Sequence, residues 1–130
     1  MRPIPPLRWA VVVVDLEPIV GHEQSGERRC LVVSYEPFHR SGRVTVCPIT
    51  AARDQTRYPN EVAIPVGEAG QTKPGVILVH QVQTIALERA MRSRQGRVRY
   101  VLDPSIRTQV RRALQRHLGL DIPPSLDGAQ

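Results

Sequence analysis

Short runs of β-branched and other apolar residues, separated by segments rich in Gly, Pro, Ser and Asn, dominate the first two thirds of the chain. Such runs are typical of strands, and such breakers of turns. No helical pattern appears before residue 85, which argues against parallel β-α-β units and favours a small barrel or sandwich. The last run follows the breaker Lys73-Pro74-Gly75. The predicted strands are Trp9 to Val14, Cys30 to Tyr35, Arg43 to Cys47, Glu61 to Pro65 and Val76 to Val79.

Helices are predicted late in the chain. Leu, Ala and Met alternate with charged residues over 85–94, and Gly96 stands where a helix often ends. Residues 97–101 alternate with period two, as a half-exposed strand does. The clearest helix spans about 104–118, because Asp103 can cap its start, Pro104 suits its first position and apolar residues recur every four positions. The predicted fold class is therefore mostly β (α+β), with residues 119–130 as a flexible tail.

The charge of the chain points to an acidic partner. Its 130 residues fit one domain, taken as 1–130, with 18 basic against 12 acidic side chains and a net charge of +6. Of the basic residues, 17 are arginine, whose planar fork matches phosphate oxygens, so a nucleic acid is the natural partner. An equally weighted explanation of the arginine excess is a high-GC or heat-adapted proteome.

The two cysteines and the longest apolar run limit the metal sites and membrane segments that the chain could form. Cys30 and Cys47 lie in strand-like apolar runs and are too few for a structural zinc site, so we predict buried core thiols. The longest apolar run, Ala10 to Val14, is far shorter than the roughly 20 residues of a membrane helix, and no signal-peptide pattern opens the chain. We expect a cytoplasmic protein without membrane contact, metal or cofactor.

Residues 21–28 form a polar loop between two predicted strands. They carry an imidazole, two carboxylates, an amide, a hydroxyl and a guanidinium, with Gly21 and Gly26 as hinges. Loops held at both ends by strands are where binding and catalytic groups concentrate. Thr50 ends another apolar run, and strand pairing could place it beside Arg28. The loop and Thr50 together are the candidate site.

The D-x-x-P-x-x-G-H-E-Q-x-G-x-R string of residues 15–28 is followed by L-V-V-S at 31–34, P-I-T at 48–50 and Q-V-Q-T-I at 81–85. This ordered set resembles the MazF/PemK family of toxin endoribonucleases, over about residues 8 to 118. The resemblance implies an SH3-like barrel with appended helices that forms a homodimer. It also implies cleavage of single-stranded RNA without a metal ion, leaving 2′,3′-cyclic phosphate and 5′-hydroxyl ends. A cognate antitoxin, whose disordered segment occupies the same groove, would neutralise the enzyme.

The residue types suit this reaction. Attack by a ribose 2′-hydroxyl requires removal of its proton, protonation of the leaving oxygen and stabilisation of charge on the phosphate. By resemblance Arg28 and Thr50 are the central pair, and we assign Arg28 to charge stabilisation because arginine is essentially never deprotonated. His22 is the candidate acid or base, with Glu23 orienting it or accepting a proton. The residues expected to bind RNA are Gln24, Ser25, Arg29, Arg53, Tyr58, His80 and Gln81.

Structural roles stand beside these functional ones. Arg28 could instead form a salt bridge with Glu27 or Glu17. Glu23 could cap a turn, and His22 could stack on a base. Thr50 could simply end a strand, and Tyr58 could be a packing residue.

The chain departs from the family pattern at several positions. Arg8-Trp9-Ala10 replaces the usual Arg-Gly-acid opening, and Arg29 replaces the proline that normally follows the motif arginine. Gln83 and Ala86 replace an arginine and an aspartate, and His80 stands where PemK-like members have an aspartate. These changes motivate a second hypothesis, a catalytically degenerate member that binds an antitoxin or another peptide. A third, resting on fold analogy, is a gyrase-poisoning toxin.

Overall fold

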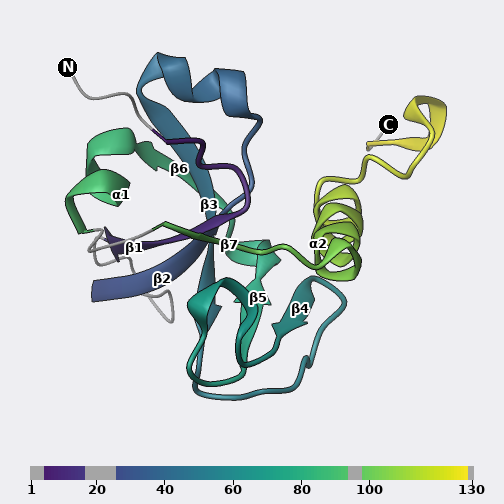
Figure 1. Ribbon diagram of the computed structural model, residues 1–130. Coiled ribbons are helices and arrows are strands. Elements are labelled where there is room, and N and C mark those ends of the chain that lie inside the picture. The colour runs from purple at the N-terminus through teal and green to yellow at the C-terminus, as the bar shows by residue number, and fades with distance from the viewer. Residues whose placement is uncertain (1–4, 17–25, 94–97, 129–130) are drawn as a thin grey trace.

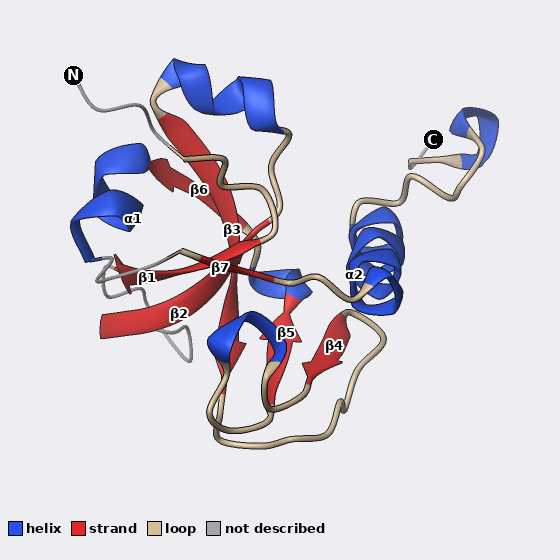
Figure 2. Cartoon of the chain, viewed as in Figure 1, coloured by secondary structure: helices blue, strands red, loops and turns tan. Residues whose placement is uncertain are grey.

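A curled antiparallel sheet forms the body of the protein in the computed structural model, which describes residues 5–16, 26–93 and 98–128 (Figures 1 and 2). Within these ranges the strand order is β4-β5-β3-β2-β1-β7, and β6 also pairs with β3, on the edge opposite to β2. The strands are β1 (Ala10–Leu16), β2 (Gly26–Val32), β3 (Arg43–Thr50), β4 (Glu61–Ile64), β5 (Gly75–Leu78), β6 (Gln83–Ala86) and β7 (Arg99–Tyr100). The α-helices are α1 (Leu87–Ser93) and α2 (Pro104–His117), and the 3-10 turns are η1 (Glu36–Ser41), η2 (Glu68–Gly70), η3 (Val79–Gln81) and η4 (Pro124–Leu126).

Strand β3 holds the sheet together. Its first half pairs with β6, its middle residues, Val46 to Pro48, pair with β2, and its last two residues pair with β5, so the sheet bends along this one strand. Both faces of β3 are buried: Val44 and Val46 point into one core, whereas Cys47 and Ile49 point into another. A strand with two buried faces reads as a continuous apolar run, as the sequence here does. The strand that ends in Thr50 is therefore fixed from both sides.

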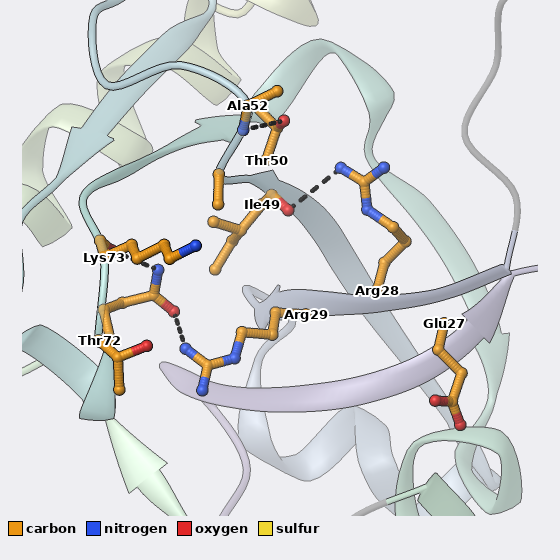
Figure 3. A pocket seen from close by; sticks show the side chains of 10 residues that line it. Glu27, Arg28, Arg29, Ile49, Thr50, Ala52, Thr72 and Lys73 are labelled. Atoms are coloured by element: carbon orange, nitrogen blue, oxygen red, sulfur yellow. Dashed lines mark hydrogen bonds between the residues drawn. The ribbon is translucent and has the colours of Figure 1, made fainter.

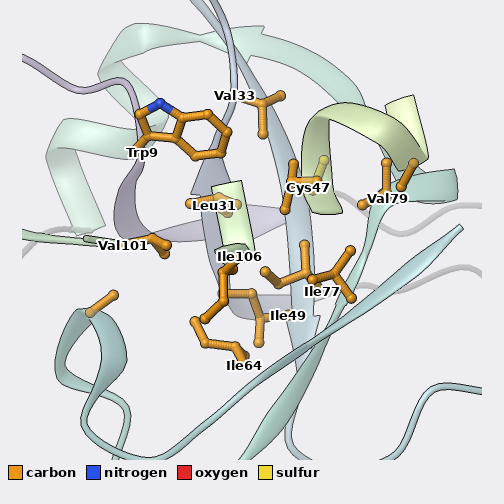
Figure 4. Close-up of a cluster of buried hydrophobic side chains, with 14 residues drawn as sticks. Trp9, Leu31, Val33, Cys47, Ile49, Ile64, Ile77, Val79, Val101 and Ile106 are labelled. Atoms are coloured by element: carbon orange, nitrogen blue, oxygen red, sulfur yellow. The ribbon is translucent and has the colours of Figure 1, made fainter. Parts of the chain in front are cut away.

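Each core is closed by one helix. α1 supplies Leu87 and Ala90 to the core formed with β1, β2 and the first half of β3. α2 supplies Ile106 and Val110 to the other core, where they lie among the side chains of β3, β4 and β5, together with Trp9 (Figure 4). Burial of such side chains is worth roughly 1.5–3 kcal/mol each. The two helices thus seal opposite faces of the curled sheet.

The start of α2 follows its sequence signals. Oδ1 of Asp103 accepts a hydrogen bond from the backbone N–H of Ser105 at 2.8 Å, and Pro104 occupies the first helical position. Gly119, just past the end, adopts the left-handed backbone with φ 68°. Arg107 anchors the helix, because its Nε donates to the Val101 carbonyl at 2.7 Å and its guanidinium lies over the ring of Trp9.

The predicted strands and the C-terminal helix are confirmed, with shifted bounds for several strands. The helix predicted from residue 85 begins at Leu87 instead, because residues 83–86 pair with β3 as strand β6. A hydrogen bond between Oγ1 of Thr84 and Oγ1 of Thr45 at 2.8 Å adds to this pairing. Tertiary pairing therefore outweighs the helical propensity of this segment.

The cysteines are buried, as predicted. Cys30 and Cys47 are free thiols with no exposed surface, and burial raises the pKa of each to about 12. No helix in the described ranges has the length and apolar character needed to cross a membrane. The described part of the C-terminal segment, residues 118–128, is largely exposed.

Candidate active site at the end of strands β2 and β3

The register of β2 and β3 explains why Arg28 and Thr50 come together. The paired residues are Cys30 with Pro48, Leu31 with Cys47 and Val32 with Val46. Continuing this antiparallel register by two residues sets Arg28 opposite Thr50, and residues opposite each other share one face of a sheet. The convergence predicted from the motif is a direct result of strand pairing.

A pocket of about 410 Å³ opens at this end of the two strands (Figure 3). Arg28 is half-buried there, and its Nη2 donates a hydrogen bond to the Ile49 carbonyl at 3.2 Å. The described ranges place no carboxylate within ion-pair distance of Arg28. The guanidinium is therefore oriented by a neutral acceptor and keeps its charge toward the pocket. The lining residues are Glu27, Arg28, Arg29, Ile49, Thr50, Ala51, Ala52, Gln71, Thr72 and Lys73.

Thr50 presents a hydroxyl group with its proton available. Oγ1 of Thr50 accepts a hydrogen bond from the backbone N–H of Ala52 at 3.2 Å. A hydroxyl has one donor and two acceptor positions, so this contact orients the group and leaves the O–H to donate. Gly75 of β5 precedes Val76, the residue that pairs with Thr50. Glycine suits this position because a Cβ there would lie 2.7 Å from the Thr50 carbonyl oxygen. The backbone around Thr50 is thus closely packed.

Arg29 and Lys73 add two more cations to the pocket. Nη1 of Arg29 donates to Oε1 of the buried Gln71 at 2.5 Å. Lys73 extends over the pocket from the segment before β5, opposite Arg28 (Figure 3). Sequence reasoning missed Gln71 and Lys73, since it treated Lys73-Pro74-Gly75 only as a strand breaker. The signal that could have found Lys73 is that it is the single lysine of the sequence.

Of the other predicted RNA-binding residues, the described ones, Arg53, Tyr58, His80 and Gln81, lie outside this pocket's lining. Arg53 pairs with the buried carboxylate of Glu61 and donates to the Gln55 carbonyl at 2.7 Å. The hydrogen bond to Glu61 raises the pKa of Arg53. Tyr58 is exposed, whereas a packing role would require burial. His80 and Gln81 belong to η3, which follows the last residue of β5, whereas Thr50 pairs with Val76 near the start of that strand.

Glu61 is the most buried carboxylate of this region. Burial acts to raise its pKa, but hydrogen bonds from the Arg53 side chain and the Arg57 N–H outweigh burial and lower the pKa below the ordinary value of 4.5. Its side chain is 1% exposed. Arg53 is therefore a structural cation, neutralised by Glu61 and holding the loop after β3 in place.

A second polar cluster joins Ser34, Glu36 and His39. The Ser34 hydroxyl lies 2.6 Å from Nε2 of His39, and Nδ1 of His39 lies 3.2 Å from Glu36. Glu36 also accepts from the backbone N–H groups of Leu7 and Arg8, and Ser34 accepts from that of Thr45. Burial acts to raise the pKa of Glu36, but these hydrogen bonds lower it overall. The cluster ties the N-terminal segment to η1 and β3.

Comparison with known proteins agrees with this geometry. The model of the family described as "PemK-like, MazF-like toxin of type II toxin-antitoxin system" matches residues 7–118. The chain belongs to this family. The resemblance read from the motifs is therefore confirmed, and the SH3-like barrel expected from it is consistent with the curled half-barrel of the PemK-like toxin fold.

Relatives of this PemK-like toxin carry names that describe their activity. The endoribonuclease toxin ChpB of Escherichia coli K12 is 34% identical over 90 residues, which cover 68% of this chain and 77% of that protein. MazF of Deinococcus radiodurans superposes with a TM-score of 0.66 at 28% identity, covering 88% of this chain and 96% of MazF. A MazE–MazF complex from the same organism gives a TM-score of 0.64 at 27% identity, covering 91% and 99%.

In this MazF-like chain the motif loop is only partly described. His22, Glu23, Gln24 and Ser25 lie outside the described residues, and so does Glu17. Two of the departures from the family pattern lie on β6: Gln83 pairs with Val46 and Ala86 with Arg43, away from the lining of the pocket. No group of three His, Cys, Asp or Glu side chains within residues 5–16, 26–93 and 98–128 is arranged to hold a metal ion.

Proposed function

We propose that the protein is an endoribonuclease toxin that cleaves single-stranded RNA by attack of a ribose 2′-hydroxyl on the adjacent phosphate, without a metal ion. The products are a 2′,3′-cyclic phosphate and a 5′-hydroxyl. Membership in the PemK-like, MazF-like family supports the reaction class. The observation that carries the proposal is the position of Arg28 and Thr50, opposite each other at the end of β2 and β3 in a pocket rich in cations.

The charges and hydrogen-bond donors of this pair match the needs of the transition state. As the 2′-oxygen attacks, negative charge grows on the non-bridging phosphate oxygens. The Arg28 guanidinium supplies a permanent positive charge, held by the Ile49 carbonyl without being neutralised. The Thr50 hydroxyl supplies a donor whose orientation is set by the Ala52 N–H. Donors oriented in advance contribute most, because they need no reorganisation during the reaction.

Proton transfer is assigned to the motif loop. His22 is the proposed acid or base, because imidazole is the side chain that titrates nearest neutral pH, and Glu23 is proposed to orient it or to accept a proton. Gly26, the first described residue of the predicted loop 21–28, has φ 80° and begins β2, so the last three residues of that loop, including Arg28, belong to the strand. His22 is therefore close to Arg28 along the chain, which supports a place for His22 near the pocket.

The proposed assembly is a cytoplasmic homodimer whose groove holds RNA or, alternatively, the peptide of a cognate antitoxin. The MazE–MazF complex among the structural relatives supports an antitoxin partner. An acidic peptide segment suits the same cationic pocket as RNA, because Arg28, Arg29 and Lys73 would attract either. Binding of the antitoxin would therefore block access of RNA.

End mapping tests the proposal directly. Purified protein is incubated with a long RNA of varied sequence in EDTA, and the new ends are analysed by ligation with and without prior phosphorylation. We expect 5′-hydroxyl ends paired with 2′,3′-cyclic phosphates. Absence of such ends across varied RNAs would overturn the nuclease proposal and favour the peptide-binding alternative, which retention of a co-expressed antitoxin would then support.

A further inference from the structure

The pocket contains two cationic groups on opposite faces of the same strand. Consecutive residues of a strand point to opposite faces, so Arg28 and Arg29 leave β2 in opposite directions at its exposed end. Figure 3 shows the Arg28 guanidinium beside the Ile49 carbonyl, and the Arg29 guanidinium pointing toward the segment that carries Thr72 and Lys73. There Arg29 donates a hydrogen bond to Gln71. Arg28 and Thr50 account for one phosphate in the proposed function. Arg29 and Lys73 have so far only a general attraction for RNA or an acidic peptide, and no specific phosphate has been assigned to them.

The partner of Arg29 is neutral. Its Nη1 donates to the amide oxygen of Gln71, which orients the guanidinium and leaves its full charge in place. Arg53 shows the contrast within the same chain, because the carboxylate of Glu61 cancels its charge. Among the described residues, the two arginines of the pocket are therefore both held by neutral acceptors and make no ion pair with a carboxylate.

Gln71 is built into the fold at this point. It is 5% exposed, its backbone N–H donates to the Glu68 carbonyl at 3.0 Å and its carbonyl accepts from the Gly67 N–H at 2.8 Å. Its Nε2 donates to the Lys73 carbonyl at 3.4 Å. One buried amide therefore fixes Arg29 with its oxygen and the segment that carries Lys73 with its nitrogen. A buried polar group used in this way sets geometry for both cations.

The remaining charge in the pocket does not cancel this pair. Three cations and one anion line the pocket, and the anion is Glu27. In Figure 3 the Glu27 carboxylate points away from Lys73 and from the Arg29 guanidinium. Arg29 and Lys73 are both exposed, so an anion can reach them from solvent. A guanidinium and an ammonium group that line one pocket can both bind phosphate oxygens of a nucleic-acid strand.

We propose that Arg29 and Lys73, positioned by Gln71, form a second phosphate subsite that binds the RNA backbone next to the phosphate held by Arg28 and Thr50. This inference rests on the proposed function, since it assigns a further part of the same RNA-binding pocket. The subsite contributes affinity and positions the strand, and it makes no contact with the reacting phosphate. Its loss therefore raises KM and leaves kcat largely unchanged, whereas loss of Arg28 or Thr50 lowers kcat.

Salt dependence of binding tests the subsite separately from cleavage. All proteins carry Thr50→Ala to slow cleavage, and the Kd for a single-stranded RNA oligonucleotide is measured by fluorescence anisotropy from 50 to 200 mM salt. Each phosphate contact contributes about 0.7 to the slope of log affinity against log salt for single strands. Arg29→Gln and Lys73→Gln are each expected to reduce the slope by about 0.7. When the salt rises from 50 to 200 mM, the affinity of each variant for RNA should therefore fall by a factor about 2.6-fold smaller than that for the parent protein. Arg112→Gln, on the exposed face of α2, is the charge-matched control.

Gln71→Glu provides a second test without removing a cation. The carboxylate keeps the shape of the amide and neutralises Arg29, so binding should weaken as in Arg29→Gln while the fluorescence of Trp9 reports an intact fold. In proteins that retain Thr50, Arg29→Gln and Lys73→Gln should raise KM at nearly constant kcat. Slopes equal to that of the Arg112→Gln control, or absence of RNA binding by the Thr50→Ala protein, would overturn the subsite. RNA binding with the expected slopes but without cleavage would overturn the nuclease proposal and leave the subsite standing.

Discussion

Nη2 of Arg28 donates a hydrogen bond to the Ile49 carbonyl at 3.2 Å, so the strand that ends in Thr50 also orients the arginine opposite it. Because strand pairing and this side-chain contact join the same two segments, Arg28 and Thr50 keep a fixed relation to each other. A site organised in this way needs little rearrangement to meet the charge of a transition state.

Arg28→Ala is expected to lower kcat by about 100- to 1000-fold, which is the typical effect of removing one donor that stabilises developing negative charge. Arg28→Lys keeps the charge but lacks the planar fork, so its rate should fall between those of the wild type and the alanine variant. Single-turnover cleavage of RNA measures both. An alanine variant as fast as the wild type would remove Arg28 from the reaction.

Thr50 is tested by two substitutions of similar size. Thr50→Ser keeps the hydroxyl that accepts from Ala52 and should retain most of the activity. Thr50→Val keeps the branched shape but has no O–H, and its kcat should fall by about 100- to 1000-fold. Equal rates for the two variants would show that Thr50 serves only to end the strand.

Gly75→Ala should disturb the site through the backbone. The added Cβ would lie 2.7 Å from the Thr50 carbonyl oxygen and 3.4 Å from Cγ2 of Ile49. Overpacking of this kind costs typically 1–3 kcal/mol, and the shift it forces moves Thr50. Urea unfolding followed by Trp9 fluorescence measures the stability, and Ala63→Ser, at an exposed position of β4, is the control. Unchanged stability and rate would show that β5 yields at this point without cost.

The lowered pKa of Glu61 predicts that the folded protein loses stability in acid. Because its pKa is lowered in the folded protein, the unfolded chain binds more protons between the folded pKa and the ordinary value of 4.5. The stabilisation is therefore complete above about pH 4.5 and is lost as the pH falls through the folded pKa. At pH 7, Glu61→Gln should have a lower Tm than the wild type. At pH 3 this Tm difference should be smaller, as measured by thermal unfolding. A Tm difference that is constant with pH would contradict this account.

The cysteines should be unreactive in the folded protein. Burial raises the pKa of Cys30 and of Cys47 to about 12, so the thiolate fraction at pH 8 is about one in ten thousand. Iodoacetamide at pH 8 should leave both thiols unmodified in the native protein and alkylate both in guanidinium chloride. Mass spectrometry counts the adducts, and rapid labelling of the native protein would show that the sheet opens around β2 and β3.

The sequence predicts the fold well where the pattern is local. The strands and the cap of α2 follow from alternation, breakers and the pair Asp103-Pro104. It fails at residues 85 and 86, where the composition predicts the start of a helix but both residues pair with β3 as the end of β6. The place of Arg28 and Thr50 follows from the family motif, and the register of β2 with β3 explains it.

Gln71 and Lys73 could not be predicted in the same way. Their position depends on β5 pairing with the last two residues of β3, a contact between segments more than twenty residues apart. Nothing in the local sequence Gln71-Thr72-Lys73 shows that Arg29 will meet it. The sequence also does not show that Arg53, a predicted RNA-binding residue, pairs with the buried carboxylate of Glu61, because a loop arginine and a strand carboxylate eight residues apart meet only in the fold.

The packing of α2 onto the core around Ile49 sets an order of events during synthesis. The segments that carry Arg28, Thr50 and Lys73 leave the ribosome before Ile106 and Val110, which belong to the same core as Ile49 and Ile77. Until the last third of the chain has emerged, that face of the sheet is open to water and β1 lacks its partner β7. A protein that attacks RNA would thus acquire a fully packed pocket only when its own translation is nearly complete.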